Sequence, residues 1–414
     1  MGAEQIGVIA RRDRQMAEET TCRIEPCLLT SYSPKLAELI AELVAVSTTL
    51  GSALHPTTAG SLAELVRAMN CYYSNLIEGH NTRPREIERA LREDFDEDDA
   101  RRDLQLEARA HIRVQRRLDA QFDSGELGEP ASKRFICWLH REFYRDAPPR
   151  MLEVEREGGT IVMTPGALRT LPEHDNVVGR HRPPASDRVA AFMEYFESRY
   201  ALEGQGRVAR IVTMAASHHR LNYIHPFIDG NGRVSRLMSH AMALKAGIGA
   251  HGLWSISRGL ARGLADRGEY RRMMDEADSP RRGDLDGRGN LSLEALTAFV
   301  SWFVEVALDQ VQLMSELFDL DSLGRRLHGY VVGTVGATEA GWLLVEEVLR
   351  RGEMPRGDAA KVSGRSERSA RDQLKLLTGA GVLASSTPKG PVSLRFLPSA
   401  ADELFPRLFV AQAQ

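Results

Sequence analysis

The chain has 414 residues, of which 43% are hydrophobic and 27% charged, and its formal net charge is -3. This length exceeds one typical hydrophobic core, so two or three folded domains are expected. The near-neutral charge excludes a global field that would draw the chain onto nucleic acid or an anionic membrane. Because no apolar stretch is long enough to span a bilayer and the N-terminal apolar run is too short for a signal peptide, the sequence predicts a cytoplasmic protein with no membrane partner.

Apolar residues at helical spacing fill most of the chain before residue 225. Ser61 is expected to cap the start of one helix and Gly79 to end it, because a serine hydroxyl satisfies unpaired helix amides and glycine tolerates the left-handed turn that stops a helix. The predicted helices cover residues 34–50, 61–79, 84–93, 99–122, 132–143, 186–200 and 207–224.

Residues 159–184 interrupt this helical pattern. The segments "GGTIVMTPGALRT" and "DNVVGRHRPP" contain β-branched residues, glycine and proline without helical periodicity, so a short β-hairpin or flap is expected there. Further on, "GDLDGRGNLSLEAL" imitates a calcium loop, but Arg288 and Ala295 stand where oxygen ligands are needed. We interpret it as a glycine-rich turn in which Ser292 caps a long helix that ends near Leu323.

The pattern changes again near the C-terminus. Residues 338–352, 355–364 and 366–381 read as a helix, a short helix and a helix, and residues 382–398 read as a hairpin. This order is typical of a winged helix-turn-helix, so a small α+β domain is expected over residues 336–414.

The loop "HPFIDGNGRVSR" joins two of the predicted helices. Consecutive amides at Gly230, Asn231 and Gly232 can point into one concavity at the start of a helix, which is a phosphate-binding arrangement. Arg233 on the first helical turn and Arg236 on the same face add forked donors for phosphate oxygens, so a polyphosphate fits better than a single phosphate.

Two further side chains of this loop bring chemistry to those phosphates. Asp229 offers a hard oxygen ligand for Mg²⁺, and His225 can accept a proton from an attacking hydroxyl near neutral pH. The arrangement is that of phosphoryl or nucleotidyl transfer to a hydroxyl. The alternative, an ordinary solvated loop between helices, explains each residue singly but not their joint occurrence.

At every motif position this stretch resembles the signature His-x-Phe-x-(Asp/Glu)-Gly-Asn-Gly-Arg-x-x-Arg of the Fic (filamentation induced by cAMP) domain family, with Phe227 as the buried apolar residue. The resemblance implies a mainly α fold: a helical bundle with a short β-hairpin flap, here over residues 106–330, after a helical region at 1–105. It implies transfer of AMP from Mg²⁺-ATP, or Mn²⁺-ATP, to a Ser, Thr or Tyr hydroxyl of a target protein.

The resemblance also implies roles for residues. His225 would be the base and Asp229 the metal ligand, and the flap would dock the target. The implied ATP-binding residues are Gly230, Asn231 and Gly232 at the α-phosphate, Arg233 at the β-phosphate, Arg236 at the γ-phosphate and Tyr270 on the adenine side.

A second stretch, "SNLIEG", resembles the family's inhibitory-helix pattern through Ser74 and Glu78. The resemblance implies that Glu78 pairs with Arg236, so that ATP binds only in an unproductive pose. A solvated glutamate at a helix end is the plain alternative, and Glu78 could instead position a water that removes AMP from a modified target. Relief by a homodimer rearrangement, by the metal or by self-modification stays open.

The predicted recognition helix of the C-terminal domain contains a row of basic residues: Arg365, Arg368, Arg371 and Lys375. Such a row could contact DNA phosphates, although Glu367 and Asp372 interrupt it. Small winged-helix domains also serve in dimerisation or target docking. The sequence therefore leaves two functions open, an autoinhibited protein adenylyltransferase and a nucleotide-sensing transcription regulator that binds DNA.

Overall fold

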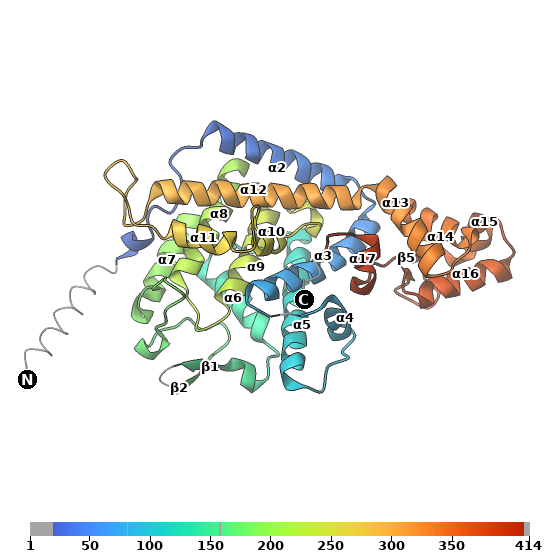
Figure 1. Cartoon of the computed structure of the whole chain (residues 1–414), viewed down its shortest axis with the longest axis horizontal. Coiled ribbons are helices and arrows are strands. Elements are labelled where there is room, and N and C mark those ends of the chain that lie inside the picture. The colour runs from blue at the N-terminus through green and yellow to red at the C-terminus, as the bar shows by residue number, and fades with distance from the viewer. Residues whose placement is uncertain (1–19, 81, 157–158, 410–414) are drawn as a thin grey trace, which may run out of the picture. The chain divides into compact units, whose positions relative to one another are not determined.

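The computed structural model describes residues 20–80, 82–156 and 159–409, and it is mainly helical, as predicted (Figure 1). The chain divides into two compact units of interleaved segments: residues 1–41, 120–246 and 260–306 form the first, and residues 42–119, 247–259 and 307–414 form the second. The sequence suggested three consecutive domains, and that functional division stays a prediction. Among the described helices, none is by itself long and apolar enough to cross a bilayer, and α2 (Pro34–Ser52) and α3 (Pro56–Ile77) meet those criteria only as a pair bent by 117°.

The first unit is built around helices α8 (Arg207–Ile224) and α9 (Asn231–Lys245), which pack against each other (Figure 1). Every residue of α8 from Ile211 to Ile224 is buried except Asn222. Helices α6 (Lys133–Tyr144) and α7 (Val189–Tyr200) cover this pair, with α6 on α9 and α7 on α8. The loop between α8 and α9 is therefore anchored in a core on both sides.

Local signals set the ends of several of these helices. Ser132 caps α6 at the start of the predicted helix, since its hydroxyl accepts the Phe135 amide at 3.1 Å. The cap of the long helix α12 (Leu293–Phe318) is also confirmed, because Ser292 Oγ accepts the Ala295 amide at 3.1 Å. However, α12 ends at Phe318 and not near Leu323: Asp319 leaves helical geometry and caps a new helix, α13.

The predicted hairpin at 159–184 overlaps the observed one only in its second strand, because the hairpin begins earlier, at Glu153. Strands β1 (Glu153–Arg156) and β2 (Gly159–Val162) pair antiparallel, with Glu153 opposite Val162. Three of the four residues of "EVER" are charged, which concealed the first strand. Residues 163–184 contain no strand beyond an isolated bridge between Val178 and His181, so the segment is a loop. The unit also contains α11 (Glu269–Ala277) and, in part, α10 (Ile256–Arg262).

The second unit holds α3 (Pro56–Ile77), which begins earlier than the expected 61–79. Pro56 occupies the first helical position, where its missing N–H costs nothing, and His55 is the N-cap. Ser61 lies inside the helix, where its hydroxyl donates to the Thr57 carbonyl at 3.2 Å, so the predicted cap is wrong. Gly79, at φ +88°, ends the helix as predicted. The neighbouring helices are α2 (Pro34–Ser52, in part), α4 (Pro84–Leu91) and α5 (Asp99–Asp123).

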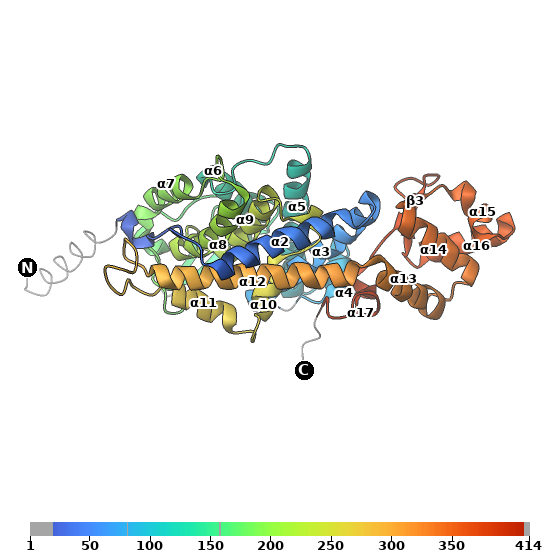
Figure 2. The ribbon, with the colours of Figure 1, turned by 90° about the horizontal axis from the view of Figure 1, so that it is seen from above.

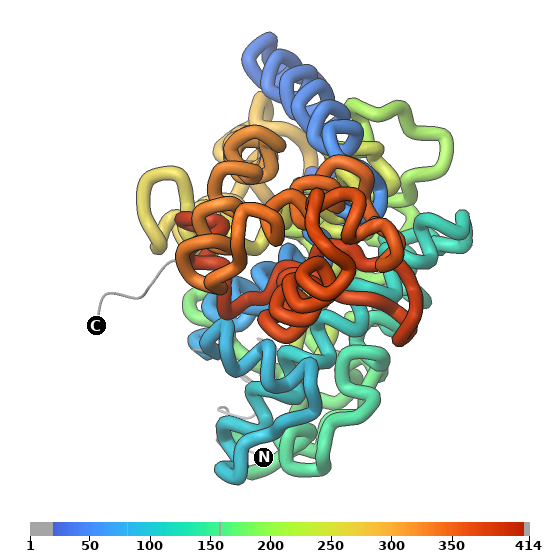
Figure 3. The backbone as a smooth tube through the Cα atoms, turned by 90° about the vertical axis from the view of Figure 1, so that its right-hand side faces the viewer, coloured from blue at the N-terminus to red at the C-terminus, as the bar shows by residue number. Residues whose placement is uncertain are grey.

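The C-terminal elements follow the predicted order of helix, short helix, helix and hairpin. The three helices of this order can be followed individually in Figure 2. Short strands β3, β4 and β5 form an antiparallel sheet in the order β3-β5-β4. Figure 3 follows this part of the second unit in red. The elements are α13 (Leu320–Gly329), α14 (Glu339–Arg351), β3 (Glu353–Met354), α15 (Ala359–Ser363), α16 (Glu367–Gly379), β4 (Leu383–Ala384), β5 (Val392–Leu394) and α17 (Ala401–Leu404).

Candidate active site

The loop from His225 to Gly230 connects α8 to α9 through two unusual backbone conformations. His225 ends α8 at φ 50° and ψ 62°, a left-handed geometry that costs a non-glycine residue about 1–2 kcal/mol. Helix cannot easily continue there, because Pro226 disfavours helical geometry in the residue before it. Gly230, at φ +80°, starts α9, and a β-carbon there would lie 2.8 Å from the Tyr144 hydroxyl, so only glycine fits.

Asn231 holds the loop closed with its side chain. Its Oδ1 accepts the Phe227 amide and its Nδ2 donates to the Phe227 carbonyl, both at 2.9 Å. Phe227 itself is fully buried, as predicted. The side-chain amide is therefore engaged with the protein, and what Asn231 presents at the start of α9 is its backbone N–H, next to those of Gly232 and Arg233.

A buried arginine that the sequence did not single out fixes the same loop. Arg169, only 1% exposed, donates through Nε to the His225 carbonyl at 2.7 Å and through Nη2 to the Ile224 carbonyl at 3.0 Å. It also donates to the Pro184 carbonyl and to Ser186 Oγ. One guanidinium thus joins the end of α8 to the segment that follows the hairpin. The only sequence signal was an arginine inside an otherwise apolar, glycine-containing stretch.

The imidazole of His225 is partly exposed, and its pKa is lowered to about 3. Desolvation is the main cause, and the neighbouring Arg169 guanidinium adds to it. The ring is therefore neutral at pH 7, which is the form that can accept a proton. Phosphates bound nearby would raise its pKa, because negative charge favours the imidazolium ion.

Asp229 is held by two donors on one oxygen. Its Oδ2 accepts from Arg233 Nη2 at 3.0 Å and from the Tyr144 hydroxyl at 3.1 Å. Burial raises the pKa of Asp229, but the Arg233 guanidinium and the hydrogen bonds outweigh it, so the pKa is lowered and the carboxylate is ionised. A backbone hydrogen bond from Gly230 also favours the ionised form.

The Asp229 carboxylate suits a divalent cation. Among the described residues, no three His, Cys, Asp or Glu side chains gather into a metal site. A lone carboxylate beside a helix N-terminus fits Mg²⁺, which is commonly held by one or two carboxylates together with substrate phosphates and water. The donor set therefore fits a cation that arrives with a nucleotide better than a resident metal.

Two other predicted nucleotide-binding residues lie along the same core. Arg236 is a buried residue of α9, and its charge, after desolvation, contributes to lowering the pKa of His218 to about 3. His218 Nε2 lies 2.9 Å from the hydroxyl of Tyr270, whose ring stacks on Trp302. Arg236, His218 and Tyr270 thus form one neighbourhood, whereas Asp229 and Arg233 form another around Tyr144.

Ser74 and Glu78 lie in the second unit. Ser74 is buried in α3, and Glu78 is an exposed residue one position beyond the last helical residue, Ile77. Their inhibitory role stays a prediction.

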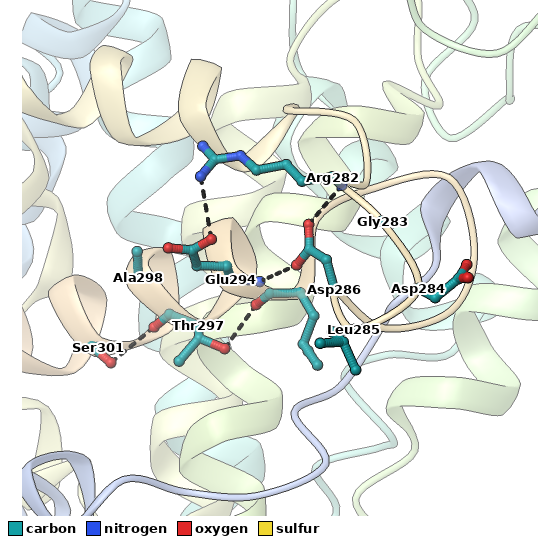
Figure 4. Close-up of a pocket in the computed structure, with 10 residues that line it drawn as sticks. Arg282, Gly283, Asp284, Leu285, Asp286, Glu294, Thr297, Ala298 and Ser301 are labelled. Atoms are coloured by element: carbon teal, nitrogen blue, oxygen red, sulfur yellow. Dashed lines mark hydrogen bonds and ion pairs between the residues drawn. The ribbon is translucent and has the colours of Figure 1, made fainter.

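A wide groove of about 810 Å³ at the start of α12 contains none of the predicted site residues. Figure 4 shows its wall, where Asp286 accepts the backbone amides of Arg282 and Glu294. Asp286 therefore closes the glycine-rich turn by hydrogen bonding, which agrees with the structural interpretation of this segment.

Comparisons with known proteins identify the domain that carries the loop. Residues 130–243 match the model of the Fic/DOC family. A stretch of 70 residues is 40% identical to "Protein adenylyltransferase Fic" of Drosophila willistoni and 39% identical to its Drosophila melanogaster counterpart. This stretch is 17% of the present chain and spans only 14% of the length of these relatives.

In fold, the chain is similar to the crystal structure of a Fic family protein from Desulfovibrio desulfuricans G20, with a TM-score of 0.51 and 16% identity over 88% of this chain and 97% of that one. The segment 130–243 is therefore a Fic/DOC domain. It contains His225, the whole of α8, and α9 up to residue 243.

Proposed function

We propose that this protein is an adenylyltransferase that moves AMP from Mg²⁺-ATP to a hydroxyl of a target protein. The observation that carries the proposal is the loop of the Fic/DOC domain, which sets a neutral imidazole, an ionised carboxylate and a helix N-terminus side by side. These are a base, a cation ligand and a phosphate cradle, and nucleotidyl transfer needs all three.

In the proposed reaction, the backbone amides of Gly230, Asn231 and Gly232 bind the α-phosphate, and Arg233 turns from Asp229 to the β-phosphate. Arg236 binds the γ-phosphate and Tyr270 lies on the adenine side. A magnesium ion, held by Asp229, would supply positive charge to the leaving pyrophosphate.

His225 then accepts the proton of the incoming hydroxyl. The hydroxyl oxygen bonds to the α-phosphorus, and the bond from that phosphorus to the bridging oxygen of the β-phosphate breaks. The products are an AMP ester on the target and pyrophosphate. Arg169 holds the His225 backbone so that the imidazole needs little reorientation for this step.

We further propose that Glu78 restrains the activity, with Ser74 on the same helix, by competing for Arg236. Removal of the Glu78 carboxylate should raise AMP transfer, and removal of the His225 imidazole should abolish it. Incubation of Glu78→Gly with α-labelled ATP should label protein more strongly than the wild type does, and His225→Ala in the same background should give no label. A Glu78→Gly protein that transfers no label with Mg²⁺ or Mn²⁺ would overturn this part of the proposal.

The C-terminal elements support a second candidate function, DNA binding by a winged helix-turn-helix. Helix α16 exposes Arg368, Arg371 and Lys375 on one face, and these side chains make no hydrogen bond or ion pair within the described ranges. Arg365 lies before the helix, and Glu367 and Asp372 are the exposed acidic residues beside the row. Unpaired cations on an exposed helix suit phosphate contacts.

The matched test is Arg371→Glu on α16 against Arg351→Glu on α14, measured by duplex DNA binding over a salt series. The α16 variant should weaken binding and reduce the salt slope by about 0.9 per lost phosphate contact. Equal binding by both variants would leave α16 without a role in DNA recognition.

A further inference from the structure

Helix α6 presents two polar aromatic side chains to Asp229 from one face. His140 and Tyr144 are four residues apart, so they lie one turn from each other on the helix. His140 Nε2 lies 3.2 Å from the Asp229 carbonyl, and the Tyr144 hydroxyl lies 3.1 Å from Asp229 Oδ2. The backbone and the side chain of Asp229 are thus held separately by the same helix.

The orientation of His140 is fixed by its surroundings. Its Nδ1 accepts the Gly166 amide at 2.7 Å, so Nε2 carries the proton that is donated to Asp229. The ring also stacks on Phe227, with centroids 4.1 Å apart and planes 16° apart. His140 therefore has both nitrogens and one face engaged, and it cannot turn without breaking these contacts.

Tyr144 holds the side chain of Asp229. Its hydroxyl and Arg233 Nη2 both donate to Oδ2. When Arg233 turns to a bound phosphate, the Tyr144 hydroxyl still donates to Oδ2. The phenol then keeps the carboxylate from rotating as the cation binds.

We propose that His140 and Tyr144 are positioning residues that hold Asp229 ready to bind the divalent cation delivered with the nucleotide. The inference rests on the proposed function, since it takes Asp229 as the cation ligand. Outer-shell partners of metal ligands typically contribute 10–100-fold in metal affinity, so removing the Tyr144 hydroxyl should weaken the cation about tenfold.

The test measures Mn²⁺ binding to the full chain by electron paramagnetic resonance, in the presence of a non-hydrolysable ATP analogue. Tyr144→Phe should bind Mn²⁺ about tenfold more weakly than the wild type. Tyr200→Phe is the matched control, because it also removes one buried phenol, hydrogen-bonded to the Cys27 carbonyl at 2.9 Å. It should leave Mn²⁺ affinity unchanged while costing similar thermal stability.

Two further variants test the roles of the two ring nitrogens of His140 one at a time. A glutamine amide can replace the donor Nε2, and an asparagine oxygen can replace the acceptor Nδ1. His140→Asn should therefore weaken Mn²⁺ binding more than His140→Gln does.

Mn²⁺ affinity in Tyr144→Phe equal to that of the wild type, or lowered equally in Tyr200→Phe, would overturn the inference while the proposed function stands. A wild-type protein that binds no Mn²⁺ beside the analogue would instead overturn the proposed function, and the inference with it.

Discussion

Arg169→Lys keeps the positive charge beside the loop from His225 to Gly230 but removes the planar fork that donates to the carbonyls of Ile224, His225 and Pro184 and to Ser186 Oγ. One lysine nitrogen cannot occupy the positions of the three guanidinium nitrogens, so at least two of these acceptors lose their donor. Each unsatisfied buried acceptor costs about 1–3 kcal/mol, so the free energy of unfolding should fall by about 3–5 kcal/mol.

Arg169→Lys should also lower the rate of AMP transfer, because it alters the contacts of the His225 backbone. Its left-handed conformation costs about 1–2 kcal/mol and is held by the Arg169 bond to the His225 carbonyl. When that bond is lost, the imidazole should move from its place, and a misplacement of about 1 Å can cost about 100-fold in rate. We therefore expect AMP transfer, measured with labelled ATP in the Glu78→Gly background, to fall about 100-fold in kcat.

Arg220→Lys is the matched control. Arg220 is also fully buried, but it donates to the carbonyls of Pro26 and Ala277, which lie outside the loop from His225 to Gly230. It should lose similar stability in urea unfolding with a much smaller loss of kcat. Equal kcat in the two variants would refute the claim that Arg169 acts by holding His225.

Other changes test the same account. Gly230→Ala should destabilise the loop by about 2 kcal/mol or more, because alanine is strained at φ +80° and its β-carbon would meet Tyr144; urea unfolding checks this, and an unchanged midpoint would contradict the tight approach. Stability should fall as the pH drops from 6.5 towards 4, because burial lowers the pKa of His140 to about 4 and of His218 to about 3, so the unfolded chain takes up protons that the folded chain does not bind. Urea unfolding midpoints at pH 7 and pH 5 measure this change in stability, and a higher midpoint at pH 5 than at pH 7 would contradict the prediction.

The sequence predicted those parts of the site that depend on neighbours along the chain. Gly230, Asn231 and Arg233 lie within one helical turn, so their meeting at the start of α9 follows from the chain itself. The same holds for the Ser292 cap, which needs only the next three residues. The misplaced start of α3 was also local, since Pro56 is a better helix-start signal than Ser61.

The residues that the sequence did not reveal act across long separations. Arg169 is 56 residues from His225, and Tyr144 is 85 residues from Asp229, so only tertiary packing brings them together. Spacing within α6 puts His140 and Tyr144 on one face but does not say what that face meets. The first strand of the hairpin was missed because three of the four β1 residues are charged and none of the four is buried.

The central claim is that the domain containing the loop from His225 to Gly230 transfers AMP from ATP to a protein hydroxyl. Mass spectrometry of the Glu78→Gly protein, incubated with cell lysate, ATP and Mg²⁺, tests it most directly. The account predicts that a Ser, Thr or Tyr residue gains the mass of one AMP group and that His225→Ala in the same background removes this gain. Unmodified protein, or a gain of phosphate alone, would contradict it.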